Sequence, residues 1–117
     1  MPYIHIVTTR TLTRQAKEEL HQCALNAADR LHKPRHVVMV CIVDGSTLQK
    51  GEEQSDCAFC DVRVVGTADA QDCDAFSAIL SADIARIAGT APGCVYLSIS
   101  GLSLCYTDGC LPPGHET

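Results

Sequence analysis

The chain has 117 residues and a formal net charge of -5, and it contains no tryptophan. One compact domain is the default at this length. The acidic balance argues against nucleic acid as the main partner, because phosphate binding calls for a basic face and base stacking calls for aromatic side chains. No stretch approaches the roughly 20 apolar residues of a membrane span, and residues 1–7 lack the basic lead-in of a signal peptide. We therefore expect a cytoplasmic protein that binds neither nucleic acid nor a membrane.

The first half of the chain predicts a strand, a helix and a second strand. Residues 3–9 are rich in Ile, Val and Thr, which is typical of a strand. Apolar residues then recur at helical spacing over residues 13–31, with Thr13 as the expected N-cap. Pro34 ends this helix, because proline disfavours helical geometry in the residue before it. Residues 36–43 are almost continuously apolar and predict a strand buried on both faces.

The second half repeats this pattern after a polar break. We expect a strand over residues 57–66, a helix over residues 72–88 with Gly89 just past its end, and a strand over residues 94–100. The tail, about residues 104–117, is rich in glycine and proline and is expected to be irregular.

The two halves, about residues 1–45 and 57–100, share one β-α-β rhythm. Each half predicts a right-handed crossover. Together they predict a single α/β domain over residues 1–117, a duplicated β-α-β unit with a four-stranded mixed sheet and two helices on one face. The other face also carries apolar residues. We therefore expect neighbouring subunits to cover it in an oligomer.

Proline at position 2 is the sharpest clue to chemistry. A small second residue permits removal of the initiator Met, which leaves a prolyl secondary amine. Burial near cations lowers the pKa of such an amine, because both disfavour its charged form. A neutral amine can take a proton from a carbon next to a carbonyl. From the residues alone, an ordinary start residue is the favoured interpretation of Pro2.

Five stretches of the sequence, in this order and spacing, resemble the macrophage migration inhibitory factor and D-dopachrome tautomerase family of the tautomerase superfamily. The resemblance covers residues 1 to about 100. The five stretches are Met1-Pro2-Tyr3-Ile4, Lys33-Pro34, Ser55-Asp56-Cys57-Ala58-Phe59-Cys60, Val65-Gly66 and Val95-Tyr96-Leu97.

The resemblance implies a homotrimer with active sites between subunits and a cofactor-independent keto–enol tautomerase, an isomerase acting on a small 2-keto acid such as phenylpyruvate. It implies Pro2 as the catalytic base and Lys33 as the cation that binds the substrate carboxylate. The backbone N–H of Val65 and the side chain of Tyr96 from the neighbouring subunit would complete the substrate site. Ser98 would also bind substrate, at a position where family members often carry asparagine.

The sequence departs from the family pattern around the expected pocket. The Phe-Gly-Gly stretch of the family is missing, with Gln49-Lys50-Gly51-Glu52-Glu53 in its place, and the aromatic C-terminal segment of the family is replaced by residues 104–110. The pocket wall is therefore less aromatic. The alternative hypothesis is a cytokine-like binding protein with vestigial or altered tautomerase activity. Such relatives are secreted without a signal peptide and bind a cell-surface receptor.

Eight cysteines are many for this length, and we expect most of them to be reduced, small apolar residues. Cys57 and Cys60 form a C-x-x-C pair, and a redox role has been proposed for this motif in relatives. The pair lies at the start of a predicted strand, where residues three apart point to opposite faces. Zinc bound by this pair with Cys105 and Cys110 is a weaker alternative, because the second pair has unusual spacing. We predict no metal site and no cofactor.

Overall fold

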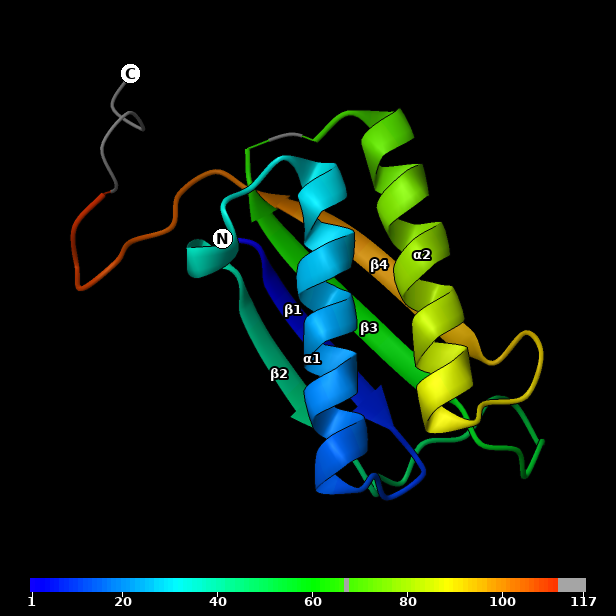
Figure 1. Ribbon diagram of the computed structural model, residues 1–117. Coiled ribbons are helices and arrows are strands. Elements are labelled where there is room, and N and C mark those ends of the chain that lie inside the picture. The colour runs from blue at the N-terminus through cyan, green and yellow to red at the C-terminus, as the bar shows by residue number, and fades with distance from the viewer. Residues whose placement is uncertain (67, 112–117) are drawn as a thin grey trace.

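The computed structural model of the protein describes residues 1–66 and 68–111. Two long helices lie side by side over one face of a four-stranded sheet (Figure 1). Both β-α-β halves expected from the sequence are present. The elements in chain order are β1 (Tyr3–Thr8), α1 (Arg14–Ala28), the 3-10 helices η1 (Asp29–Leu31) and η2 (Arg35–Val37), β2 (Met39–Val43), β3 (Ala58–Val65), α2 (Ala70–Ala88) and β4 (Val95–Leu102).

Local capping fixes the ends of both long helices. The Thr13 hydroxyl accepts the N–H of Ala16 at 3.1 Å, which confirms the expected N-cap of α1. The Asp69 carboxylate accepts the N–H of Gln71 at 3.0 Å, so α2 begins at Ala70, slightly before the predicted start. Gly89 ends α2 with a φ of 64°, a left-handed conformation that suits glycine.

The strand order is β2-β1-β3-β4. β1 is parallel to β2 and antiparallel to β3, and β3 is parallel to β4, which confirms the mixed sheet. Tyr3 pairs with Met39 on one side and with Arg63 on the other. Consequently the starts of β1 and β2 and the ends of β3 and β4 meet at one edge of the sheet, near the N-terminus (Figure 1).

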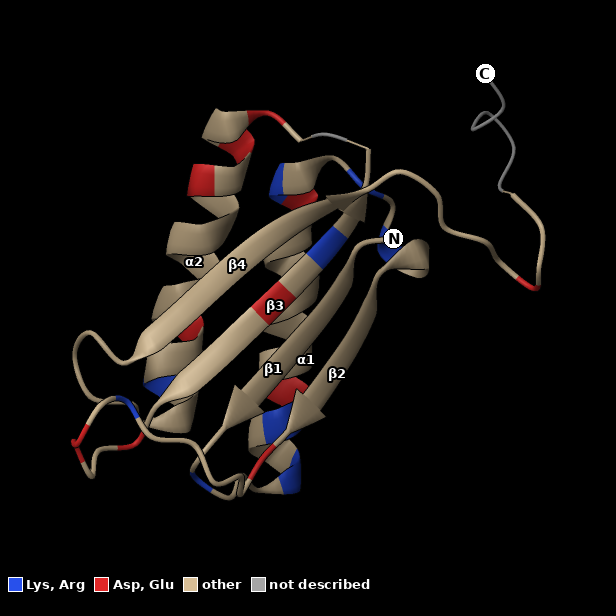
Figure 2. Cartoon of the chain, turned by 180° about the vertical axis from the view of Figure 1, so that it is seen from behind, with Lys and Arg blue, Asp and Glu red and all other residues tan. Residues whose placement is uncertain are grey.

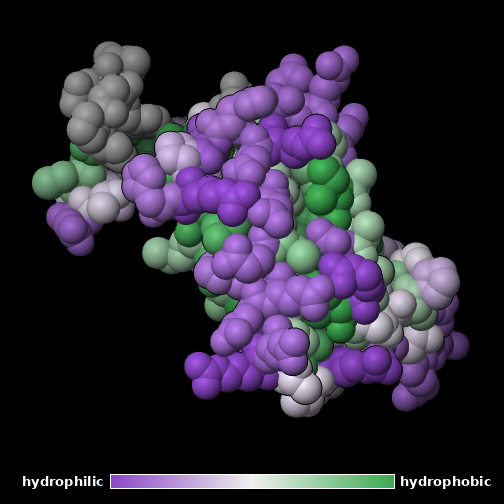
Figure 3. Space-filling view, in the orientation of Figure 1, coloured by the Kyte–Doolittle hydropathy of each residue, from purple (hydrophilic) through white to green (hydrophobic). Residues whose placement is uncertain are grey.

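The core lies between the sheet and the helices. β3 alternates strictly, with Ala58, Cys60, Val62 and Val64 buried against the helical layer. Phe76 and Leu80 of α2 are fully buried opposite them. Hydrophilic side chains cover most of the outer surface of the helices (Figure 3). Burial of apolar surface at about 25 cal/mol per Å² is the main term that holds the two layers together.

Among the described residues, no helix covers the second face of the sheet, which we call the open face (Figure 2). Residues 36–43 were predicted to form a strand that is buried on both faces, and this prediction is wrong in its start and in its burial. η2 occupies Arg35–Val37, so β2 begins only at Met39. β2 is an edge strand, and Met39 is 65% exposed and Val43 is 40% exposed. The strand is therefore not buried on both faces in the single chain, although its sequence is apolar on both.

The segment after β4 leads away from the sheet (Figure 1). Leu104 and Tyr106 are more than half exposed, and Thr107 and Cys110 form an isolated β-bridge. The irregular tail was expected over residues 104–117, of which 112–117 lie outside the described residues.

Candidate functional site at the N-terminal edge of the sheet

The N-terminus is fixed beside the start of β2 by two hydrogen bonds. The Met1 amino group donates to the carbonyl of Val37 at 2.8 Å, and the N–H of Met39 donates to the carbonyl of Pro2 at 3.0 Å. The side chain of Pro2 is less than 2% exposed. The start of the chain is therefore held in place rather than left free in solvent.

The electrostatic surroundings of the N-terminus favour a neutral amine. Burial lowers the pKa of the Met1 amino group. The thiol of Cys105 opposes this shift, and the ammonium of Lys33 adds to it. Lys33 is half-buried in the turn between η1 and η2, directly after His32 with its left-handed backbone. The structure thus brings Lys33, the predicted cation, close to the N-terminal amine.

Val65 reaches the same edge as the last residue of β3. The antiparallel register pairs Tyr3 with Arg63, so extending it by two residues places Val65 opposite Met1. The next residue is tied down as well, since the N–H of Gly66 donates to the carbonyl of Leu102 at 2.8 Å. Pro2, Lys33 and Val65, which lie in three separate segments of the sequence, therefore meet at one edge.

Tyr96 lies at the opposite end of the sheet. Tyr96 pairs with Phe59 at the start of β3. The edge near the N-terminus of the chain is instead where β3 and β4 end, at the pair of Val65 and Leu102. The strand from Tyr96 to Leu102 spans about 20 Å at the usual rise of about 3.3 Å per residue. Within one chain, Tyr96 therefore does not reach Pro2.

Ser98 lies between these two ends on β4. Its hydroxyl donates to the Asp61 carboxylate at 3.3 Å, across the parallel pair of β3 and β4. Ser98 follows Tyr96 by two residues and so faces the same side of the sheet. A substrate at Ser98 would share the hydroxyl with Asp61.

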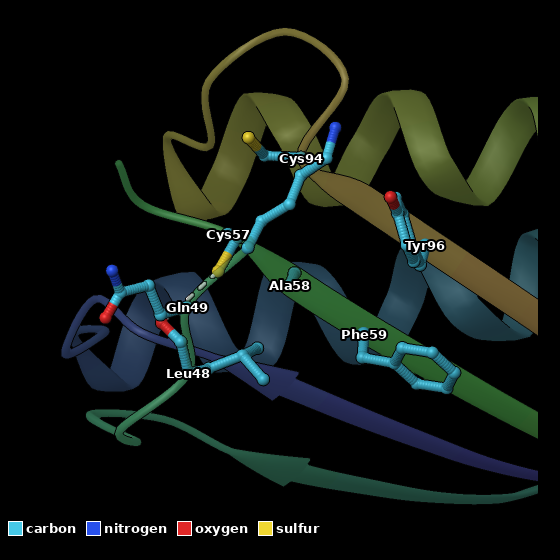
Figure 4. A pocket seen from close by; sticks show the side chains of 8 residues that line it. Leu48, Gln49, Cys57, Ala58, Phe59, Cys94 and Tyr96 are labelled. Carbon is cyan, nitrogen blue, oxygen red and sulfur yellow. Dashed lines mark hydrogen bonds between the residues drawn. The ribbon is translucent and has the colours of Figure 1, made fainter. Parts of the chain in front are cut away.

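A hollow of about 210 Å³ lies beside Tyr96. Figure 4 shows its walls, which combine the loop before β3 with the starts of β3 and β4. Apolar groups and two thiols dominate the lining, and Lys50 and Gln49 supply charge and an amide. The lining residues are Leu48, Gln49, Lys50, Cys57, Ala58, Phe59, Cys94 and Tyr96. The sequence identifies Gln49 and Lys50 only as a departure from the family pattern and does not predict that they lie beside Tyr96.

The C-x-x-C thiols are buried and lie in different surroundings. Burial raises the pKa of Cys60 to about 12, and Cys60 points into the core. Burial also raises the pKa of Cys57, whose thiol donates to the Leu48 carbonyl at 3.4 Å. A redox thiol needs a lowered pKa. These surroundings therefore favour inert thiols, and the redox prediction gains no support from them.

Two further properties bear on the class of protein. Within residues 1–66 and 68–111, no three His, Cys, Asp or Glu side chains are grouped so as to hold a metal ion. In the same part of the chain, neither helix has the length and apolar character needed to cross a bilayer.

Comparison with known proteins identifies the family of the fold. The family model for macrophage migration inhibitory factor (MIF) matches residues 1–100. The structure of Leishmania major MIF2 superposes with a TM-score of 0.88 at 18% identity, covering 95% of this chain and 97% of that one. Macrophage migration inhibitory factor of Toxoplasma gondii superposes with a TM-score of 0.76 at 26% identity, covering 86% and 90%. A third structure, of Pt0534 inactivated by 2-oxo-3-pentynoate, superposes with a TM-score of 0.80 at 17% identity, covering 93% and 95%. No curated protein matches the sequence at a significant level.

Proposed function

The chain belongs to the macrophage migration inhibitory factor family, and we propose that it is a cofactor-independent keto–enol tautomerase acting on a small 2-keto acid such as phenylpyruvate. The observation that carries this proposal is the position of the N-terminus, which lies half-buried near Lys33. Burial and Lys33 both lower the pKa of the amine there. This arrangement prepares an amine to act as a base near neutral pH.

Removal of Met1 is the first requirement of the mechanism. While Met1 is present, the nitrogen of Pro2 is a tertiary amide without basicity. After its removal, Pro2 carries a secondary amine in the place now held by the Met1–Pro2 peptide bond. Burial and Lys33 act on this amine in the same direction as on the Met1 amino group, because both disfavour a positive charge there.

The neutral Pro2 amine then takes a proton from C3 of the keto acid. The C3–H electron pair becomes the C2=C3 bond, and the carbonyl electrons move to oxygen as an enolate. The Pro2 ammonium then gives the same proton to this oxygen, which forms the enol and leaves the amine neutral again. Lys33 binds the substrate carboxylate, and the N–H of Val65 stabilises the charge that develops on the enolate. The reverse sequence returns the proton to C3.

A neighbouring subunit completes this site in the proposal. Tyr96 lies about 20 Å from the N-terminal edge of its own chain, at the usual rise per residue. The open face carries exposed apolar side chains such as Met39, Val43 and Phe59, which a second copy would cover. We place Tyr96 and Ser98 of one subunit against Pro2 of the next, in a homotrimer.

Covalent labelling tests the base directly. The alkynyl keto acid 2-oxo-3-pentynoate inactivates a structural relative. Here a neutral Pro2 amine would add to its triple bond, with the amine proton passing to the adjacent carbon. Peptide mass spectrometry of protein freed of Met1 should locate the whole reagent mass on Pro2, together with loss of phenylpyruvate turnover. Labelling at a cysteine with Pro2 unmodified would contradict the proposal.

A second candidate is a cytokine-like binding role, favoured by the family itself and by the departures around Lys50. A Pro2→Gly variant separates the two roles, because it should abolish turnover and leave binding to a receptor-bearing cell unchanged. Cell binding that survives in this variant, combined with no turnover by the wild type, would favour the binding role.

A further inference from the structure

Lys50 lies directly over Tyr96. Its ammonium is 5.5 Å from the centroid of the tyrosine ring, within the range of a cation–π contact. The same ammonium donates to the carbonyl of Gly93 at 2.8 Å, just before β4. These two contacts fix the cation to the strand that carries Tyr96. If Tyr96 enters the site of a neighbouring subunit, Lys50 enters it too.

The hollow between Lys50 and Tyr96 suits an organic anion. Leu48, Ala58 and Phe59 provide an apolar wall, and Lys50 is the charged side chain in the lining. An ammonium has three N–H donors, of which one is used on Gly93. Among the described carboxylates none forms an ion pair with Lys50, and the nearby Glu53 accepts instead from the thiol of Cys94 at 3.7 Å. Two donors therefore remain for a ligand.

We propose that Lys50 binds a second carboxylate of the substrate, so that the preferred substrates are 2-keto dicarboxylic acids. This inference rests on the proposed tautomerase function. The keto-acid end binds to Lys33 and presents C3 to Pro2 of one subunit. The distal carboxylate extends toward Tyr96 and meets Lys50 of the neighbouring subunit. Carboxylate–ammonium hydrogen bonds are about twice as strong as neutral ones, and partial exclusion of water strengthens them further.

The test compares two substrates of matched shape. In 2-oxopentanedioate the distal group is a carboxylate, and in 5-methyl-2-oxohexanoate an isopropyl group replaces it. Exchange of the C3 hydrogens for deuterium, followed by NMR, reports the step assigned to Pro2 for both. The variant Lys50→Met removes the charge and keeps much of the side chain. Lys50→Arg keeps the charge, and Arg14→Met removes a charge from an exposed position on α1.

The inference predicts a ratio of kcat/KM that favours 2-oxopentanedioate in the wild type. Lys50→Met should lower this ratio about tenfold or more. Lys50→Arg and Arg14→Met should keep most of the preference for 2-oxopentanedioate. An equal effect of Lys50→Met on both substrates would overturn the role of Lys50 and leave the tautomerase intact. If the wild type turns over neither substrate, the proposed function fails. Calorimetry of 2-oxopentanedioate binding then tests the role of Lys50 separately. Binding of 2-oxopentanedioate that weakens in Lys50→Met supports the second carboxylate site, and unchanged or absent binding overturns it.

Discussion

Burial lowers the pKa of the Met1 amino group, and the side chain of Lys33 adds to this shift, although a strand and a helix separate the two residues in the sequence. The sheet produces this relationship, because β1 and β2 start at the same edge and the turn with Lys33 leads into β2. After removal of Met1, the Pro2 amine would also have Lys33 as a neighbour.

This relationship predicts a pH dependence. The base acts in its neutral form, so kcat/KM rises with pH through the lowered pKa of the amine and then levels off. Lys33→Met removes a positive neighbour and therefore raises that pKa, which moves the rising limb to higher pH. It also removes the carboxylate ligand, so KM should rise about tenfold. A rising limb at the same pH in both proteins would show that Lys33 does not act on the base.

The close approach of Gly101 and Gly66 predicts a steric effect at the end of β4. A Cβ added at Gly101 would lie 2.6 Å from the carbonyl oxygen of Gly66, which is backbone and has little freedom to move. Gly101→Ala should therefore destabilise the fold by about 1–3 kcal/mol, measured by urea unfolding, and should lower turnover by displacing Val65. Ser100→Ala, at the exposed neighbouring position, is the control and should behave as wild type. A fully stable Gly101→Ala would contradict the packing at this edge.

The open face predicts the effect of a charge in β2. Val43 is 40% exposed in the single chain, so Val43→Glu should fold normally by circular dichroism. In an oligomer the new carboxylate would be buried without a partner, which is costly. Sedimentation should show loss of the proposed trimer. Turnover should fall more than about tenfold, because in the proposed site Tyr96 would no longer reach a neighbouring Pro2. Gln22→Glu on the exposed face of α1 adds the same charge without either effect. A trimeric, active Val43→Glu would place the interface elsewhere.

The sequence predicted those parts of the fold that local chemistry decides. Thr13 caps the start of α1 and Gly89 ends α2, as expected, because a helix cap depends only on its own residue and the near neighbours in the sequence. The surroundings of β2 were predicted wrongly, because burial depends on which strands flank it and an apolar pattern does not say that a strand lies at an edge.

In the candidate site, too, contacts between residues far apart in the sequence were not predicted. Pro2, Lys33, Val65 and Tyr96 were singled out through the family resemblance, and they stay predictions as functional residues. The contact of Lys50 with Tyr96 and the effect of Cys105 on the N-terminus were missed. Each joins residues far apart in the chain, so no local pattern of residue types indicates it.

The burial of Cys60 predicts the order of thiol alkylation. Its pKa of about 12 leaves very little thiolate at pH 8, and its side chain is fully buried. Iodoacetamide should therefore modify the exposed Cys110 first and leave Cys60 unmodified until the protein unfolds. Peptide mapping over time measures the order, with urea-unfolded protein as the control. Early modification of Cys60 in the native state would revive the redox hypothesis for the C-x-x-C pair.

The most direct test of the central claim is the conversion of phenylpyruvate between its keto and enol forms, followed by ultraviolet absorbance. Three proteins are compared: wild type shown by mass spectrometry to lack Met1, the same protein with Met1 retained, and Pro2→Gly without Met1. We predict turnover by the first and a loss of at least about a hundredfold in kcat/KM for the other two, as expected when a general base is removed. Equal turnover with Met1 retained or with Pro2 replaced would contradict the assignment of Pro2 as the base.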